Sequence, residues 1–248
     1  MSMSNITTIA YETWEEFKSN VVRELFDDGV FRSGRYIFRG QCSADWSLES
    51  SFDRCFSSLP GTKRQAIADD LALNFFQQCR ARGLAPFGDD DHLRIIAYAQ
   101  HYGLPTRLLD WTESPYVAAF FALSEVIALS WQERLCSIWV LDTLSKAWAA
   151  PGMRVEIVRP PCEGNERLRN QLGRFTINRS QHSAIDKYIE DSAADDEPLK
   201  VILIPTKEAF KAVADLDAMG INYSNLFPGV EGCARSSRLR LLVSLQKE

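Results

Sequence analysis

The amino-acid sequence predicts an α+β protein in which a mixed central β-sheet has helices on its flanks. Apolar residues recur with helical spacing in several segments, and short β-rich runs lie between these segments in an irregular order. A doubly wound parallel sheet would instead show a regular alternation of strands and helices. The 248 residues are 46% hydrophobic and 25% charged, which is typical of a globular protein. We therefore expect one continuous domain over residues 1–248.

The first third of the chain is expected to hold two helices and one strand. A helix is predicted over residues 11–26, with Thr13 as its cap and Glu16 as the capping-box partner. Residues 35–39 form a β-rich run that predicts a strand. A second helix is predicted over residues 65–82, and its expected buried face consists of Ala68, Leu71, Phe75 and Cys79.

Hydrophobic periodicity and turn residues divide the rest of the chain into short elements. The predicted helices cover 93–101, 115–129, 166–172 and 207–219. The predicted strands cover 108–109, 137–141, 155–158, 174–177, 199–204 and 239–245. In the first of these helices, Ile95, Ile96 and Ala99 are expected to face inward.

The overall charge opposes non-specific DNA binding, because the chain has a net charge of −5 and an isoelectric point of about 5.4. Six arginines nevertheless crowd one region, namely Arg154, Arg159, Arg167, Arg169, Arg174 and Arg179. They predict either a local basic groove or a solvated face. In the second case the arginines pair with carboxylates such as Glu156, Glu163 and Glu166.

Segments that would direct the chain into or across a membrane are not recognisable. No apolar run approaches the roughly 20 residues of a membrane span, and no basic region is followed by an apolar one at the N-terminus. The six cysteines show no Cys-x-x-Cys spacing, so we expect free thiols in a reducing compartment. These features favour a cytoplasmic protein without a membrane partner.

The sequence also lacks the short motifs of several large enzyme classes. It has no Walker A loop, Gly-x-Gly-x-x-Gly, His-Glu-x-x-His or Gly-x-Ser-x-Gly. This argues against a kinase, a Rossmann dehydrogenase, a zinc peptidase and an α/β-hydrolase. Three histidines are too few for a histidine-rich metal site, so we expect no metal cofactor.

Residues 99–123 combine polar side chains with apolar runs in a way that a simple core segment does not require. Every buried polar group must find a partner or cost roughly 1–3 kcal/mol. If this segment is an extended strand, its successive side chains point to opposite faces. One face then carries Thr106, Leu108, Asp110 and Thr112, and the other carries Arg107, Leu109 and Trp111. We therefore expect this segment to contribute to a ligand site.

Structural and functional roles are both open for two residues of this segment. Asp110 either pairs with an arginine, Arg39 or Arg107, or acts directly on a ligand. His101 lies at a helix end and is either a core histidine or a ligand contact. Ser114 is expected to cap the helix that follows it.

Arg39 lies at the end of a predicted strand and is followed by Gly40. A glycine allows a ligand to approach the backbone closely, and an arginine can form two parallel hydrogen bonds to a phosphate or a carboxylate. The alternative is an ion pair between Arg39 and a carboxylate such as Asp110. Two roles are also open for Gln171, because its amide can bind a ribose hydroxyl or lie on the surface at a helix end.

Two of these segments resemble a known family. Phe38-Arg39-Gly40 matches the triplet after which the FRG domain family is named, and residues 101–112, His-Tyr-Gly-Leu-Pro-Thr-Arg-Leu-Leu-Asp-Trp-Thr, match its longer signature. Residues 171–176, Gln-Leu-Gly-Arg-Phe-Thr, resemble its Gln-x-Gly-x-Phe element. The resemblance spans residues 30–180, which we expect to form a signature core preceded by the helix 11–26.

The order of these motifs is similar to that of ADP-ribosyltransferases, which implies a split sheet and NAD as co-substrate. By this resemblance, Arg39 grips NAD, Thr112 shapes the nicotinamide pocket and Gln171 acts near the ribose or the acceptor. Trp111 or Tyr116 stacks on the nicotinamide. The further residues implied in cofactor binding are Phe38, Gly40, Gln41, His101, Thr106, Arg107 and Asp110.

The resemblance implies an intracellular NAD-dependent enzyme that transfers ADP-ribose to a protein or nucleic-acid acceptor, as a toxin or a phage-defence effector does. If the reaction needs a carboxylate in place of Gln171, then Glu163, Glu166 or Glu231 would have to supply it. The alternative is a non-catalytic module that binds a phosphate or nucleotide ligand. A third hypothesis is a nuclease-like enzyme that uses Asp110 with a metal.

Overall fold

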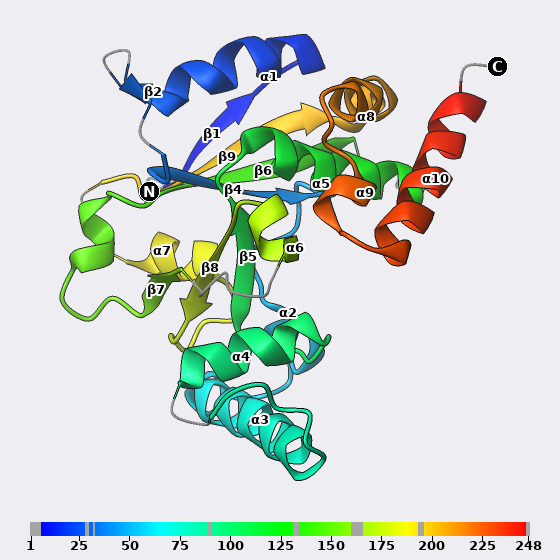
Figure 1. Cartoon of the computed structure of the whole chain (residues 1–248). Coiled ribbons are helices and arrows are strands. Elements are labelled where there is room, and N and C mark those ends of the chain that lie inside the picture. The colour runs from blue at the N-terminus through cyan, green and yellow to red at the C-terminus, as the bar shows by residue number, and fades with distance from the viewer. Residues whose placement is uncertain are drawn as a thin grey trace.

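The computed structural model describes residues 6–27, 30–31, 33–88, 91–130, 134–159, 166–192 and 196–246. The strands of its main sheet are β1 (Ile6–Ala10), β4 (Tyr36–Gln41), β5 (Leu108–Thr112), β6 (Leu135–Asp142), β7 (Val155–Val158), β8 (Gly173–Asn178) and β9 (Leu199–Pro205). These seven strands have the order β1-β9-β6-β4-β5-β8-β7 (Figure 1). A separate ribbon pairs β2 (Phe26–Asp27) with β3 (Val30–Phe31).

Helices lie on both faces of the sheet and at one end of it (Figure 1). The α-helices are α1 (Trp14–Val21), α2 (Ser51–Cys55), α3 (Gly61–Ala81), α4 (His92–His101), α5 (Pro115–Ala128), α6 (Glu166–Asn170), α7 (Ile185–Asp191), α8 (Ala209–Ala218), α9 (Tyr223–Leu226) and α10 (Val230–Leu245). The short 3₁₀ helices are η1 (Val22–Leu25), η2 (Lys146–Ala149) and η3 (Thr206–Glu208). None of the described helices has the length and apolar character of a membrane span.

The sheet is mixed, because β1 runs parallel to β9 whereas every other neighbouring pair is antiparallel. Since β9 pairs with both β1 and β6, the C-terminal quarter of the chain contributes to the same sheet as the N-terminus. The prediction of an α+β fold with a mixed central sheet and flanking helices is confirmed.

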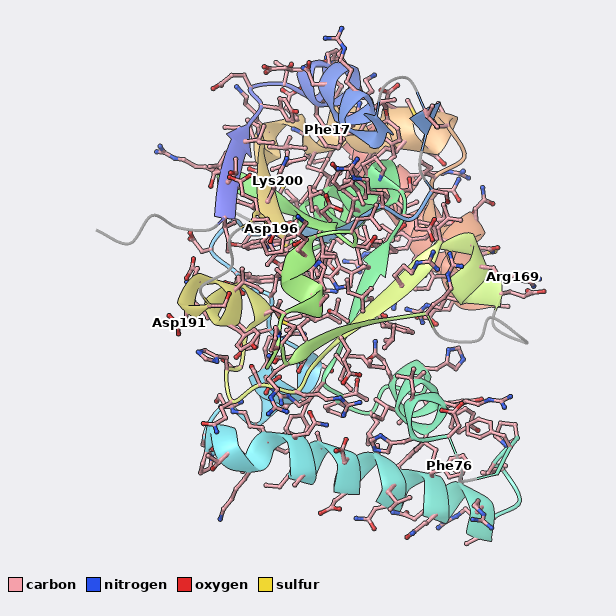
Figure 2. The ribbon with its side chains drawn as sticks, turned by 90° about the vertical axis from the view of Figure 1, so that its left-hand side faces the viewer. Phe17, Phe76, Arg169, Asp191, Asp196 and Lys200 are labelled. Carbon is pink, nitrogen blue, oxygen red and sulfur yellow. The ribbon has the colours of Figure 1, made fainter. Side chains whose placement is uncertain are left out.

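Three apolar clusters join the layers. The first packs α1, α5, α8, α9 and α10 against β4, β6 and β9, and the second packs α7 against the opposite face of the sheet. Ile37 and Phe38 are neighbours in β4 but belong to different clusters, because successive side chains of a strand point to opposite faces. The third cluster joins α3 and α4 to β5 and β8, and Phe76 is its fully buried member from α3, labelled in Figure 2.

Most of the predicted elements are present, with shifted ends. Thr13 caps α1 by accepting a hydrogen bond from the amide of Glu16 at 3.2 Å, although the Glu16 carboxylate bonds the amide of Glu12 and not that of Thr13. Ser114 caps α5 as expected, and it accepts from the amide of Val117 at 3.3 Å. The strands and α-helices that were not predicted are β1, β2, β3, α2, α7 and α9. β1 is a short strand whose partner β9 lies far along the chain, so local pattern is a weak guide to it.

The predicted strand over 239–245 is wrong, because these residues end the helix α10. The helix packs through a narrow stripe at Gly232, Ser236 and Leu239, four and three residues apart. A Cβ on Gly232 would overlap the carbonyl oxygen of Phe227, so the helix approaches the turn before it very closely. Small residues give this stripe a weak hydrophobic signal, whereas Leu241 and Leu245 are exposed.

The predicted inner face of α3 is largely wrong. Of the expected residues only Ala68 is buried, and the rest of the buried stripe is Arg64, Ala72 and Phe76. The ion pair of Arg64 with Asp53 starts this stripe, so a charged residue sets a face that apolar periodicity assigned elsewhere. In α4, by contrast, Ile95, Ile96 and Ala99 are buried as expected.

The cysteines carry no disulfide within the described residues. Cys42, Cys55, Cys79, Cys136 and Cys233 are free thiols, which agrees with the expectation for these five. Cys162 lies outside the described residues.

We expect the contact between α1 and α8 to make stability depend on pH in the acid range. Asp215 accepts a hydrogen bond from Trp14 Nε1 at 2.7 Å and forms an ion pair with Lys18, and these two contacts hold its pKa below the usual range. Because the folded-state pKa is depressed, this stabilisation is present above the unfolded value of about 3.9 and disappears as pH falls through the folded value. Asp215→Asn should therefore have a lower melting temperature than wild type at neutral pH. Because the ion pair is accessible to solvent, the loss in the free energy of unfolding should be less than about 1 kcal/mol.

Thermal melts of wild type and Asp215→Asn from neutral to strongly acidic pH test this expectation. The two melting curves should converge in acid, because the wild-type carboxyl is then protonated as well. A difference of constant size across the whole series would contradict it.

Candidate functional site

The main sheet opens between β4 and β5. These strands share a single residue pair, Phe38 with Thr112, and the β4 residues after Phe38 pair only with β6. The side chain of Arg39 bridges the opening, because its Nη1 donates to the carbonyl oxygen of Asp110 at 2.8 Å. The sheet is thus split locally at the Phe-Arg-Gly triplet.

A cavity of about 1540 Å³ lies at this opening. Its walls come from β4, β5 and the segment before α2, from α4 on one side, and from α5, α6, α9 and α10 on the other (Figure 1). Ligand pockets for small molecules usually measure about 300–1,000 Å³. The volume is therefore sufficient for a ligand together with part of a second molecule.

Most of the residues expected at a ligand site line this cavity. They come from four separate segments of the chain, and they are Phe38, Arg39, Gly40, Gln41, His101, Asp110, Trp111, Thr112 and Gln171. The structure therefore brings together the triplet, the long signature and the late glutamine. It does not bring Thr106, Arg107 and Tyr116 to the cavity.

Arg39 has hydrogen-bond donors that the described residues do not use. Its Nε atom is buried without a hydrogen-bond partner among them. Burial lowers the pKa of the guanidinium, and the nearby Asp110 opposes that change. The expected ion pair with Asp110 is not formed, since Arg39 binds the main-chain oxygen and the Asp110 carboxylate accepts from Gln100 Nε2 at 2.9 Å. A half-buried arginine with an unpaired Nε is suited to an anionic ligand.

The cavity concentrates positive charge in a chain that is negative overall. Its lining holds six arginines, Arg39, Arg54, Arg94, Arg167, Arg235 and Arg238. The carboxylates in the lining are Asp45, Glu49, Asp110 and Glu125. Excess positive charge in a concave site attracts anions, so the lining favours a ligand with phosphate or carboxylate groups.

Aromatic rings lie beside these arginines. The Arg167 guanidinium is 4.2 Å from the ring centroid of Phe227, and that of Arg94 is 4.4 Å from the centroid of Phe87. Tyr98 and Tyr102 stand 4.8 Å apart at the α4 side, where Tyr102 is 63% exposed. The exposed ring of Tyr102 therefore offers a stacking face to a planar group of a ligand, whereas Phe87 and Phe227 already face arginines.

The arginines that crowd one region of the sequence were expected to form either a basic groove or a solvated face, and the structure shows some of each. Arg159, Arg169, Arg174 and Arg179 pair with Glu113, Glu166, Glu113 and Glu156, respectively. Arg169 points away from the body of the molecule in Figure 2. The solvated face is therefore correct for Arg159, Arg169 and Arg179, whereas the Arg174 side chain is only 12% exposed and Arg167 lines the cavity. Glu163 lies outside the described residues.

Arg107 is a structural cation and not part of the cavity lining. Its side chain is 1% exposed, and its Nε donates to the Asp53 carboxylate at 3.1 Å. Its Nη1 and Nη2 donate to the carbonyl oxygens of Ser180 and His182 at 3.1 and 2.9 Å. With these donors satisfied internally, the expected role in ligand binding is corrected.

Thr106 and Tyr116 are likewise directed elsewhere. The Thr106 hydroxyl donates to Gln100 Oε1, and Gln100 Nε2 in turn donates to the Asp110 carboxylate. Thr106 therefore orients the Gln100 side chain and does not face the cavity itself. The Tyr116 ring packs edge-on against Trp14 and Phe17 of α1, at centroid distances of 6.4 and 6.2 Å. Tyr116 is therefore not placed to stack on a ligand in the cavity.

Gly40 is required by packing within the protein. A Cβ at this position would overlap the carbonyl oxygen of Ala118 and lie 2.9 Å from the amide nitrogen of Ala122. The helix α5 crosses β4 at this glycine, so the close approach expected for a ligand is made by α5 instead. The other face of β4 carries Arg39 into the opening.

Gln41 and Trp111 line the cavity with side chains that are already bonded. Trp139 Nε1 donates to Gln41 Oε1 at 2.9 Å, and Gln41 Nε2 donates to the Ser47 carbonyl. Trp111 is buried and donates from Nε1 to Thr176 Oγ1 at 2.9 Å. These two residues therefore shape the wall of the cavity.

Thr112 and Gln171 differ in what they leave free. The Thr112 hydroxyl oxygen accepts from the amide of Ser114 at 3.1 Å and keeps its own hydrogen for a further acceptor. Gln171 Nε2 donates to the carbonyl oxygen of Leu226 at 3.1 Å, which leaves its amide oxygen as the group available to a ligand. Gln171 is half-buried at the cavity and is not a free surface residue.

Several cavity residues were missed from the sequence. Arg235 and Arg238 lie on α10, whose C-terminal half was expected to be a strand. Glu125 is a single carboxylate within the otherwise apolar run of α5, which is a signal that the sequence does contain. Arg54 had no distinguishing local pattern.

Comparison with known proteins identifies one family. Residues 34–129 match the family model described as the FRG domain. No curated protein and no solved structure is detectably similar to the chain. The matched segment runs from just before β4 to just after α5, so it contains Arg39, Asp110 and Glu125 but not Gln171. Within the described residues, no group of three or more His, Cys, Asp or Glu side chains is arranged to hold a metal ion.

Proposed function

The chain contains an FRG domain over residues 34–129, and we propose that it binds NAD in the cavity at the opened sheet and transfers ADP-ribose to a protein or nucleic-acid acceptor. The observation that carries this proposal is Arg39, a half-buried arginine whose buried Nε has no partner among the described residues, at the opening between two central strands. A pyrophosphate is an anion that such a group can bind with two hydrogen bonds.

The lining supports the remaining parts of a dinucleotide. Arg54 and Arg167 add positive charge to the same cavity as Arg39, and the half-buried ring of Phe121 offers a face for stacking. Thr112 keeps a hydroxyl hydrogen and Gln171 an amide oxygen for ribose hydroxyls or for the acceptor. These roles use groups that the fold leaves unsatisfied.

The chemistry in this proposal is mostly positioning. When the bond between the ribose carbon C1′ and the nicotinamide nitrogen breaks, positive charge develops on the ribose. An enclosed site can hold the acceptor near C1′ and stabilise that charge with fixed groups. The cavity volume leaves room for part of an acceptor beside the dinucleotide. An enzyme of this kind that consumes cellular NAD or modifies a macromolecule would act as a toxin or a phage-defence effector in the cytoplasm.

A second candidate is a module that binds a phosphate or nucleotide ligand without turnover. It is favoured by Gln171, because an amide occupies the position where a carboxylate would be expected in a transferase. Such a module would use Arg39 in the same way and release no nicotinamide.

Calorimetric titration of NAD into wild type, Arg39→Ala and Arg169→Ala tests the proposal, followed by measurement of nicotinamide release in the same samples. Loss of a charge-assisted hydrogen bond typically costs about 1.5–3 kcal/mol, so Arg39→Ala should weaken binding by roughly 10- to 150-fold. Arg169→Ala is a matched control, because this arginine is 61% exposed and lies outside the cavity lining.

The outcomes separate the two candidates. Binding that depends on Arg39, together with nicotinamide release by wild type, supports the transferase. Binding without release supports the module. Absence of heat with NAD in all three proteins would overturn the proposal.

A further inference from the structure

The site lacks a carboxylate at the position of Gln171, and the two expected substitutes that the structure describes, Glu166 and Glu231, are not in the cavity lining. Glu166 is exposed and pairs with Arg169 at 3.9 Å, and Glu231 pairs with Arg235 at 2.6 Å. Glu163 lies outside the described residues. A carboxylate for the reaction must therefore be sought among the residues that line the cavity.

Glu125 is such a residue, and it lies on the helix α5 that crosses β4. Ten of the fourteen residues of this helix are buried, including Ser124 and Val126 on either side of Glu125. Glu125 itself lines the cavity. The helix is fixed against β4 at Gly40, so its position relative to Arg39 is set by rigid backbone packing.

The groups around Glu125 are mostly cationic. Arg39 of β4, Arg54 of α2 and Arg235 of α10 all lower the pKa of its carboxyl through their charge, and the neighbouring thiol of Cys42 acts in the same direction. Cys42 is fully buried, and burial raises the pKa of its thiol to about 11, so the thiol stays protonated at neutral pH. Glu125 is thus held beside the arginine that we assign to the pyrophosphate.

Glu125 as a whole is exposed, but desolvation of its carboxyl in the wall of the cavity raises the pKa of that group. The nearby guanidiniums oppose that change without cancelling it. A carboxylate with a raised pKa is a better proton acceptor at neutral pH than an ordinary one.

We propose that Glu125 is the catalytic carboxylate of this site, an inference that rests on the proposed function. The bond between ribose C1′ and the nicotinamide nitrogen breaks, and its electron pair leaves with nicotinamide. A lone pair of the acceptor forms the new bond to C1′. The proton of the acceptor passes to the Glu125 carboxylate and from there to water, so no oxidant or reductant is needed.

Glu125→Gln tests this assignment, because the amide keeps the size of the side chain and removes the base. We expect NAD to bind as tightly as to wild type or more tightly, since a negative charge beside an anionic ligand is lost. Nicotinamide release should fall by about 10²- to 10⁴-fold, the usual range for loss of general acid–base catalysis. Glu166→Gln is the control, because Glu166 is an exposed glutamate outside the lining.

The pH profile supplies a readout that a purely structural role would not change. Wild-type release should lose activity on the acid side at a pH above the ordinary glutamate value of about 4.3, and this limb should be absent in Glu125→Gln. A variant that releases nicotinamide at the wild-type rate overturns the role of Glu125 and leaves the transferase standing. Loss of NAD binding in the variant also overturns it. A wild-type protein that neither binds nor cleaves NAD overturns both proposals.

Discussion

Replacing Gly40 by alanine is expected to lower the free energy of unfolding by more than about 3 kcal/mol, at the upper end of what overpacking costs. The new Cβ would overlap the carbonyl oxygen of Ala118 and lie 2.8 Å from the carbonyl carbon of the same residue. These are backbone atoms in the first turn of a largely buried helix, so no rotamer change can relieve the overlap. The helix α5 would have to move away from β4 as a whole.

Thermal unfolding measures this effect. For a chain of this size a loss of 1 kcal/mol shifts the melting temperature by about 2–4 °C, so the shift for Gly40→Ala should be at least about 6 °C. The double variant Gly40→Ala/Ala118→Gly should not recover stability, because the overlapping atom is main-chain. A Gly40→Ala protein that melts within a degree or two of wild type would contradict the packing that we describe.

Gly103→Ala is the matched control. Gly103 has a φ of +85° and no atom within 4 Å of the position that a Cβ would take. Its replacement therefore tests backbone strain alone, which costs roughly 1–2 kcal/mol in the left-handed region. The larger loss at Gly40 would then be due to the contact between α5 and β4.

Gly40 also shows where interpretation of the sequence reached its limit. Its place after Arg39 predicted a backbone open to a ligand, and the strand itself was predicted correctly. The residue that approaches Gly40, however, is 78 positions further along the chain (118 − 40), so no local pattern could identify it. The contact could be identified only once the packing of α5 against β4 was known.

Local patterns predicted well the elements that carry their own signals. The cap at Ser114, the proline that follows it and the continuous apolar run identify α5 without tertiary information. The helix α10 has the opposite character, because its buried stripe of Gly232, Ser236 and Leu239 contains little apolar surface. Its Leu-rich end then favoured the assignment of a strand.

The candidate site was predicted through residue types and the resemblance of their order, and the structure brings most of these residues to one cavity. Arg107 was misassigned because an arginine in a signature predicts a ligand contact and a buried ion pair equally well. The deciding partner, Asp53, lies 54 residues earlier in the chain. Asp53 stands between two buried arginines, which makes it the second position where a large effect is expected.

Asp53→Ala is expected to destabilise the fold by about 3–5 kcal/mol, the cost of leaving a buried charge without its partner. The Asp53 side chain is fully buried and accepts from Arg64 Nη1 and Arg107 Nε, both at 3.1 Å. The Ser50 hydroxyl also donates to it, at 2.7 Å. Removal of the carboxylate would leave two guanidiniums of low exposure facing each other.

Urea unfolding of Asp53→Ala and Asp53→Asn separates charge from shape. The asparagine variant keeps the volume but removes the charge, and its NH2 group replaces the oxygen that accepts from one of the two guanidiniums, so it should lose most of the same stability. Asp217→Ala is the control, because Asp217 binds Arg240 through two hydrogen bonds of 2.8 Å while that arginine is 60% exposed. The cost there should stay below about 1 kcal/mol.

The Asp53 network also links the fold to the site. It joins α2, the start of α3 and the start of β5, and α2 carries Arg54 into the cavity. Amide exchange in α3 and α4 should therefore become faster in Asp53→Ala before the rest of the sheet is affected, since local openings follow the weakest contacts. Exchange that accelerates uniformly across the sheet, or losses within about 1 kcal/mol in both Asp53 variants, would show that the two arginines do not depend on this carboxylate.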